Sequence, residues 1–192
     1  VKPEAGPEAS VKYRDVPFAQ PPVGEGRWSA PVSFDTPEHE IAPLQEPVMC
    51  PQPQSMTSGG AEGDYLGDED CLYLDIYAPG PASIISDLPV MVWIHGGSNV
   101  SGYKGTYDFS RLAARQKVIV VVINYRLGPF GWFVHPALNG ANLASPALAN
   151  FGTLDMIEAL RWTQSNIERF GGNPDNVTVF GESAGGRNVF SL

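Results

Sequence analysis

The sequence predicts an α/β fold with a mostly parallel central sheet and flanking helices. Residues 89–95 and 118–125 are short apolar runs, rich in β-branched side chains and without polar alternation, as in strands buried on both faces of a sheet. Residues 107–116, between these runs, carry apolar side chains at helical spacing. Strands that alternate with helices favour a parallel sheet.

The second half of the chain continues this alternation. Apolar residues recur at helical spacing from about residue 152 to the Gly-Gly-Asn-Pro breaker at 171–174, and residues 176–180 form a further apolar run. Fourteen of the eighteen prolines precede residue 90. Because proline disrupts helix interiors, we expect loops and short edge strands there rather than long helices.

Composition and charge exclude several classes of protein. The 192 residues include 12 basic and 21 acidic side chains, a formal net charge of −9, so a nucleic-acid partner is not expected. Apolar residues make up 43% and charged residues 17%, which favours a globular core over disorder. The longest aliphatic run is residues 118–123, whereas a membrane span needs roughly twenty residues, so no membrane span is predicted.

The two cysteines, Cys50 and Cys71, favour a disulfide. They lack the CxxC spacing and the neighbouring histidines of a zinc site, so no metal site is predicted. A disulfide closing this loop stabilises the fold by about 3 kcal/mol on the chain-entropy estimate. The alternative is a pair of reduced cysteines in a cytosolic protein.

Residues 180–186, with the sequence FGESAGG, carry the strongest catalytic signal. They place a G-x-S-x-G motif directly after a predicted strand, which is the context of a nucleophile elbow. The small residues Gly181 and Gly185 allow the chain to turn sharply on either side of Glu182 and Ser183. The following helix N-terminus would point backbone N–H groups at a developing oxyanion. The alternative is an ordinary loop.

A second motif, His95-Gly96-Gly97-Ser98, follows the strand expected at residues 89–95. An oxyanion hole needs backbone N–H donors close to the substrate, and glycines after a strand leave room for that approach. The alternative is a strand-ending Gly-Gly turn without a ligand.

From about Tyr13 to its end, the sequence resembles the type-B carboxylesterases and cholinesterases of the α/β-hydrolase superfamily. Seven separated blocks occur in the family's order, so the likeness is specific. They lie at residues 17–24 with 27–28, 69–77, 124–129, 150–155, 159–162, 170–178 and 180–186. The resemblance implies that residues 1–192 are the N-terminal part of a single α/β-hydrolase domain.

The resemblance implies an enzyme that hydrolyses carboxylic esters through an acyl-enzyme and needs no cofactor. It assigns Ser183 as the nucleophile, and the N–H groups of Gly97, Ser98 and Ala184 as the oxyanion hole. The expected partner is a small-molecule ester.

Two structural features also follow from the resemblance. Cys50 and Cys71 match the family's N-terminal disulfide around an omega loop, and Glu69 with Arg126 matches its buried ion pair. A disulfide implies a secreted or periplasmic protein.

The sequence departs from the family at three places. The family often has a third glycine and an aromatic residue after His-Gly-Gly, whereas this chain has Ser98 and Asn99, so the acyl pocket is expected to differ. The loop between the cysteines holds Tyr65 but no tryptophan, the aromatic face that binds choline-type cations best, which argues against a cholinesterase. Arg187 stands where the family commonly has a small residue, and nothing in the sequence explains it.

The catalytic base is missing from the sequence. In this fold the chain order is Ser, then Asp or Glu, then His, yet none of the nine residues after Ser183 is Asp, Glu or His. His39, His95 and His135 all precede Ser183. We interpret His39 as a loop residue, His95 as a structural residue of the oxyanion loop, and His135 as a surface or pocket-wall residue. We expect the remainder of the domain either as a separate chain after cleavage or as a continuation of this one.

Two rival functions stay open. One is an esterase-like binding or adhesion domain that keeps the fold without catalysis, although the retained Ser183 and glycines argue against it. The other is an amidase or lactonase on the same scaffold, which depends on pocket residues outside this sequence.

Overall fold

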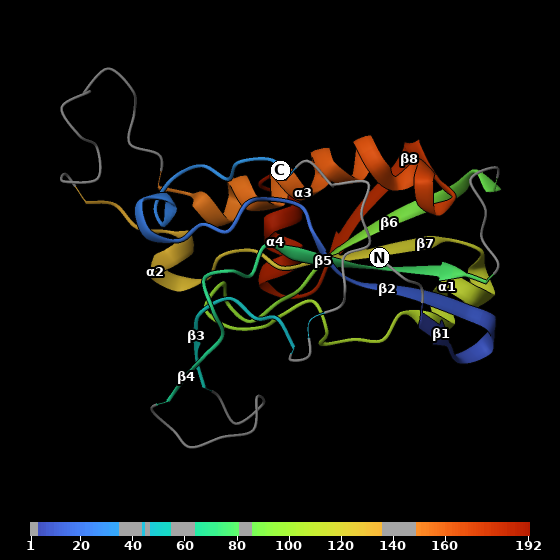
Figure 1. The fold of residues 1–192 in the computed structure, drawn as a ribbon, viewed down its shortest axis with the longest axis horizontal. Helices are drawn as coiled ribbons and strands as arrows, with labels where there is room; N and C mark the ends of the chain where they lie inside the picture. Colours follow the sequence, from blue (N-terminus) through green and yellow to red (C-terminus); the bar gives the residue numbers. More distant parts are fainter. Residues whose placement is uncertain (1–3, 35–43, 45–46, 55–63, 81–85, 136–148) are drawn as a thin grey trace.

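A six-stranded sheet runs through the centre of the molecule in the order β1-β2-β5-β7-β6-β8 (Figure 1). The computed structural model describes residues 4–34, 44, 47–54, 64–80, 86–135 and 149–192. The six strands are β1 (Glu4–Gly6), β2 (Ser10–Pro17), β5 (Tyr73–Pro79), β6 (Leu88–Ile94), β7 (Ile119–Ile123) and β8 (Gly172–Gly181). A separate two-stranded sheet pairs β3 (Gln52–Pro53) with β4 (Tyr65–Leu66).

The helices lie mainly in the second half of the chain, as the proline distribution predicts. They are α1 (Ser110–Gln116), α2 (Gly128–Gly131), α3 (Phe151–Asn166) and α4 (Ala184–Val189), with 3-10 turns at Pro7–Ala9, Gly24–Gly26 and Ile167–Phe170. Within the described ranges, no helix is long and apolar enough to cross a bilayer.

The predicted parallel pairing is confirmed for three strands. β7, β6 and β8 run parallel, because α1 and α3 return the chain across the sheet before each new strand begins. β1, β2 and β5 pair antiparallel, and β5 joins β7 antiparallel, so the whole sheet is mixed.

Helices cover both faces of the sheet. Alternate side chains of a strand point to opposite faces, so Val92 packs in the same cluster as Met156 of α3, whereas Trp93 packs with Ala113 of α1. All five residues of β7 are buried, which confirms the expected burial on both faces. β8 lies at the edge of the described sheet and is only partly buried.

Two element boundaries differ from the sequence prediction. The first helix begins at Ser110 rather than at residue 107, because the Asp108 carboxylate accepts the backbone N–H of Ser110 at 2.8 Å and favours a turn there. The last strand begins at Gly172 rather than at residue 176, and it is irregular between its pairings with Leu88 and Val90 of β6.

The predicted disulfide between Cys50 and Cys71 is confirmed. The two sulfurs are bonded, the Cα atoms lie 5.0 Å apart, and both residues are buried in the main core.

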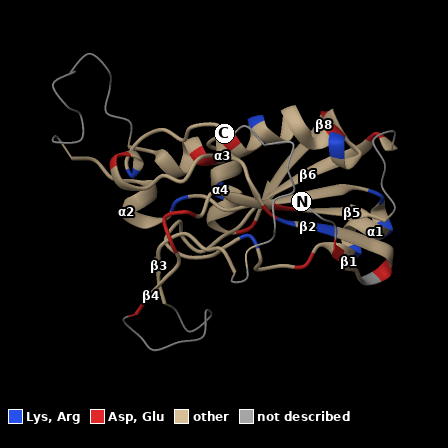
Figure 2. Ribbon diagram, viewed as in Figure 1, with Lys and Arg blue, Asp and Glu red and all other residues tan. Residues whose placement is uncertain are grey.

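Charged residues of both signs are scattered along the described chain (Figure 2).

The predicted ion pair between Glu69 and Arg126 is wrong. Arg126 follows β7 and reaches α3, where its guanidinium donates to both Asp155 oxygens at 2.8 and 2.7 Å. Glu69 instead accepts two hydrogen bonds from Arg27, at 2.5 and 2.6 Å. Each carboxylate thus binds a bidentate guanidinium of its own. Arg126 also donates to the Arg27 carbonyl oxygen at 2.9 Å, which links the two pairs.

We expect Asp155→Asn to destabilise the protein far more than Glu69→Gln. Arg126 and Asp155 have side chains only 2% and 0% exposed, so neutralising Asp155 leaves a buried, uncompensated guanidinium and costs about 3–5 kcal/mol. Arg27 and Glu69 are more exposed, so water can replace the lost partner. Denaturant unfolding of both variants measures the difference, and an equally large loss with Glu69→Gln would contradict the assignment.

Candidate active site

The two glycine motifs meet at the carboxyl ends of the parallel strands β6 and β8. β6 and β8 are parallel neighbours, with Trp93 paired to Phe180 and Ile94 to Gly181, so the residues after both strands emerge side by side. The approach is close: a Cβ placed on Gly96 would lie 2.6 Å from the Glu182 carboxylate and 3.1 Å from the Ser183 Cβ. The glycine at position 96 therefore allows the two segments to touch.

Ser183 sits in the turn between β8 and α4 with a strained backbone. Its φ of 55° and ψ of −119° lie outside the regions that L-residues favour, and its side chain is exposed. The turn closes because the backbone carbonyl oxygen of Glu182 accepts the backbone N–H of Gly185 at 2.8 Å. A Cβ on Gly185 would lie 2.0 Å from the Ile94 carbonyl oxygen, and one on Gly181 would lie 2.6 Å from Gly185, so both glycines are required sterically.

The loop after β6 carries three consecutive residues in left-handed conformation. Gly97, Ser98 and Asn99 have φ values of 98°, 58° and 59°. The Gly97 carbonyl oxygen accepts the backbone N–H groups of Val100 and Ser101 at 2.9 and 3.0 Å, which folds the loop back on itself. A Cβ on Gly97 would lie 2.1 Å from the Ser101 carbonyl oxygen, so no other residue fits there without rearrangement.

His95 supports this loop from inside the protein. The residue is 1% exposed, its ring stacks on Tyr125 with centroids 4.4 Å apart, and its Nδ1 lies 2.8 Å from the Gly96 carbonyl oxygen. Burial lowers the pKa of His95 to about 4, so the ring is neutral at neutral pH and Nδ1 donates to Gly96. Among the described residues, no group hydrogen-bonds to its Nε2.

Gln52 ties the loop to the disulfide region. Its buried side-chain amide donates to the Gly102 carbonyl oxygen at 3.0 Å and accepts the Gly102 N–H at 2.8 Å. It also donates to the Cys50 carbonyl oxygen at 3.1 Å. A cavity of about 410 Å³ opens beside this contact, next to the elbow. Its lining comprises Met49, Gln52, Gly96, Gly97, Ser101, Gly102, Tyr103, Thr106, Tyr107 and Glu182.

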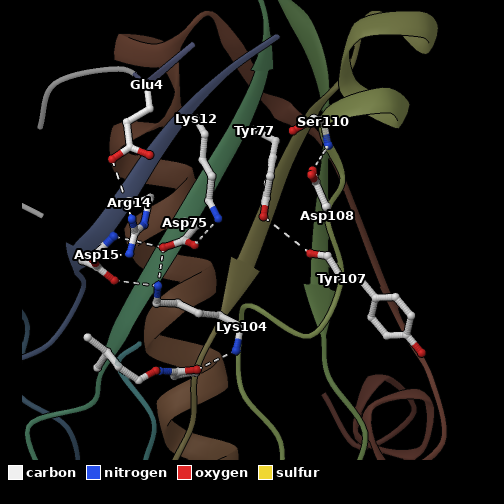
Figure 3. Close-up of polar contacts among 12 residues, drawn as sticks. Glu4, Lys12, Arg14, Asp15, Asp75, Tyr77, Lys104, Tyr107, Asp108 and Ser110 are labelled. Atoms are coloured by element: carbon white, nitrogen blue, oxygen red, sulfur yellow. Dashed lines mark hydrogen bonds and ion pairs between the residues drawn. The ribbon is translucent and has the colours of Figure 1, made fainter. Parts of the chain in front are cut away.

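A buried charge cluster anchors the far end of the same loop (Figure 3). The Lys104 ammonium contacts Asp15 and Asp75 at 2.7 and 2.5 Å, and Lys12 contacts Asp75 at 3.0 Å. Burial by itself raises the pKa of Asp75, but Lys104 and Lys12 outweigh it and lower that pKa, so the carboxylate stays ionised. The Lys104 backbone N–H donates to Asn124 at 2.8 Å.

The structure brings the predicted loop and elbow residues together. The other histidine that it describes, His135, is exposed and stacks on Phe133 with centroids 6.1 Å apart. His39 lies outside the described residues. In the described part of the chain, no three His, Cys, Asp or Glu side chains are grouped as a metal site would require.

Several residues of this site were not found from the sequence. No sequence motif indicates the charge cluster of Asp15, Asp75 and Lys104, or the hydrogen bonds from Gln52 to Gly102. Each depends on residues that are far apart in the chain. Asn99 did stand out in the sequence, since the family often has an aromatic residue at that position. The sequence did not indicate that its side chain pairs with Asn188.

The family model described as "Carboxylesterase family" matches residues 2–192. The chain belongs to the carboxylesterase family. It is 46% identical over 183 residues to para-nitrobenzyl esterase of Bacillus subtilis strain 168, covering 94% of this chain and 36% of that protein. It is 43% identical over 199 residues to cocaine esterase of Homo sapiens, covering 97% and 34%. The chain thus spans about a third of the length of these relatives.

Solved carboxylesterases have the same arrangement of elements. A thermophilic pNB esterase superposes with a TM-score of 0.81 at 43% identity, covering 97% of this chain and 38% of that one. A Geobacillus stearothermophilus carboxylesterase gives 0.77 at 34% identity, covering 98% and 37%. These likenesses confirm the predicted α/β-hydrolase fold of the carboxylesterase chain.

We expect Gly185→Ala to destabilise this carboxylesterase chain by roughly 1–3 kcal/mol and to displace the elbow, because its Cβ would collide with the backbone of β6. Gly26→Ala is the matched control, since a Cβ at Gly26 meets nothing within 4 Å. Thermal unfolding compares the two variants. Equal stability of both would show that the elbow does not need a glycine there.

We expect His95 to make the protein less stable as the pH falls. Below the unfolded-state pKa of 6.5, His95 is protonated in the unfolded chain but stays neutral in the folded protein until about pH 4. The free energy of unfolding therefore falls by on the order of 3 kcal/mol across that window. In His95→Asn the amide can still donate to Gly96, but it does not titrate. Unfolding free energies at pH 7.5, 6 and 4.5 should therefore fall more steeply in the wild type, and parallel curves would refute the assignment.

Proposed function

We propose that the protein containing this chain is a serine hydrolase that acts on carboxylic esters, with Ser183 as the nucleophile. The observation that carries this proposal is the exposed, strained Ser183 at the start of α4, in contact range of the Gly96–Gly97 loop. Membership of the carboxylesterase family supports it. A hydroxyl held on such a turn is accessible to a carbonyl carbon from the open side of the sheet edge.

The proposed oxyanion hole consists of the N–H groups of Gly97, Ser98 and Ala184. In a trans peptide the C=O and the following N–H point in opposite directions. The Gly96 carbonyl is held by His95, and the Gly97 carbonyl is turned into its own loop, so the N–H groups of Gly97 and Ser98 point away from these partners. Removing one such donor typically costs 10²–10³-fold in kcat, roughly.

The proposed mechanism proceeds in two steps. In the first step a histidine takes the proton of the Ser183 hydroxyl as its oxygen attacks the ester carbonyl, and passes that proton to the leaving alcohol. In the second step the same histidine takes a proton from water, which attacks the acyl-enzyme, and returns it to Ser183 as the acid product leaves. His95 does not serve as that base, because it is buried, its ring is stacked on Tyr125 and its Nδ1 is engaged by the Gly96 carbonyl oxygen. We assign the histidine and its acid to the part of the protein outside this chain, either continuous with it or a separate chain.

The proposed substrate class is the carboxylic ester in general. The relatives are named for para-nitrobenzyl esters and for cocaine, and what these names share is an ester. We further propose that the protein resides in an oxidising compartment, secreted or periplasmic, which the buried disulfide supports. The alternatives are an amidase or lactonase on the same scaffold and a binding domain without catalysis, and the test below separates the binding domain from the enzymes.

Ser183→Ala in the full-length protein should abolish hydrolysis of p-nitrophenyl acetate without lowering the melting temperature. A serine-directed organophosphonate should add one adduct mass to the wild type at Ser183 and none to the variant. Ser29→Ala, another exposed serine, is the matched control and should behave as the wild type. Absence of turnover and labelling in folded wild type would favour the binding-domain alternative, and residual turnover in Ser183→Ala would refute the nucleophile.

A further inference from the structure

Two asparagine side chains connect the loop after β6 to helix α4. The Asn188 amide donates to the Asn99 Oδ1 at 2.9 Å, and the Asn99 amide donates to the Asn188 Oδ1 at 3.3 Å. The two residues are 89 positions apart in the sequence. Asn188 is 8% exposed and Asn99 is partly buried, so the reciprocal pair is largely shielded from water.

The surrounding groups fix the Asn99 end of this pair. The φ of Asn99 is 59°, a conformation that asparagine tolerates better than most residues. The backbone carbonyl oxygen of Asn99 accepts the Gly128 N–H at 2.7 Å. The Tyr125 hydroxyl lies 3.3 Å from Asn99 Oδ1 and donates to the His95 carbonyl oxygen at 2.8 Å. The pair is therefore joined to the base of the loop as well as to the helix.

The pair spans the two halves of the proposed oxyanion hole. Asn99 directly follows Ser98, whose N–H is one proposed donor, and Asn188 lies one helical turn after Ala184, whose N–H is another. The donors belong to separate elements, so their spacing depends on what holds the loop against the helix. A hole misplaced by a fraction of an ångström loses much of its effect on the transition state.

We propose that Asn99 and Asn188 are positioning residues, which set the distance between the loop donors and the elbow donor through their reciprocal amide pair. This inference rests on the proposed function. In this chain two side-chain hydrogen bonds join the loop to the helix. Because both amides are shielded, each satisfies the other at little cost, whereas one alone leaves a polar group unpaired.

A double-mutant cycle in the full-length protein tests the proposal. Asn99→Gly removes the amide and keeps the positive φ, and Asn188→Ala keeps the helix. Each variant should lower kcat for p-nitrophenyl acetate about ten-fold and change KM less than about two-fold, since the donors act on the transition state. The double variant should be no slower than the worse single variant, because both remove one shared interaction.

Asn166→Ala is the matched control. It also deletes a helix asparagine amide, which donates to the Trp162 carbonyl oxygen at 2.9 Å, but it lies at the end of α3. This control should keep kcat within about two-fold of the wild type at a similar melting temperature. Should Asn188→Ala not fold, Asn188→Ser replaces it, because serine can bond back to the helix carbonyl of Ala184 without reaching Asn99.

The outcomes separate the two proposals. If the wild type is active, two results would overturn the positioning role alone. One is an unchanged kcat in both single variants, and the other is a double variant whose loss in kcat equals the product of the two single losses. A folded wild type without turnover overturns the proposed function and the positioning role with it.

Discussion

The parallel pairing of β6 with β8 is the constraint on which the site depends. It brings the ends of two strands, separated by nearly ninety residues of sequence, to the same edge at hydrogen-bonding distance. The turns that follow must then share a space too narrow for side chains, and Gly96, Gly181 and Gly185 are the positions where a Cβ would collide with the neighbouring backbone. These three glycines are therefore a steric consequence of the pairing of β6 with β8, and they allow the turn in which Ser183 is exposed.

Buried polar groups hold the surrounding loops in place. Arg126 with Asp155 joins the end of β7 to α3, and Lys104 with Asp15 and Asp75 joins the loop after β6 to the antiparallel strands. A buried charge that loses its partner is costly in free energy, so a loop movement that separated these pairs would be unfavourable. The pairs therefore restrict the loops to one arrangement.

Sequence reasoning predicted the parts of the fold that depend on local pattern. The apolar runs gave β6 and β7, helical spacing gave α3, and the G-x-S-x-G motif gave the turn at Ser183, because in each case the backbone conformation follows from neighbouring residues. The ion pairs were different. The sequence contains Arg27, Glu69 and Arg126 without indicating which of them meet, since that depends on how far each side chain reaches in the folded protein. The Asn99–Asn188 pair could not be found for the same reason.

The positive φ of Ser183 restricts which side chains could ever serve at that position. A β-branched residue is strongly disfavoured there, because its second γ atom would crowd the adjacent carbonyl groups. Threonine, although it carries the same hydroxyl, is thus a poor replacement, whereas cysteine has the shape of serine and fits the turn. The backbone of this elbow selects among nucleophiles by shape before their reactivity has any effect.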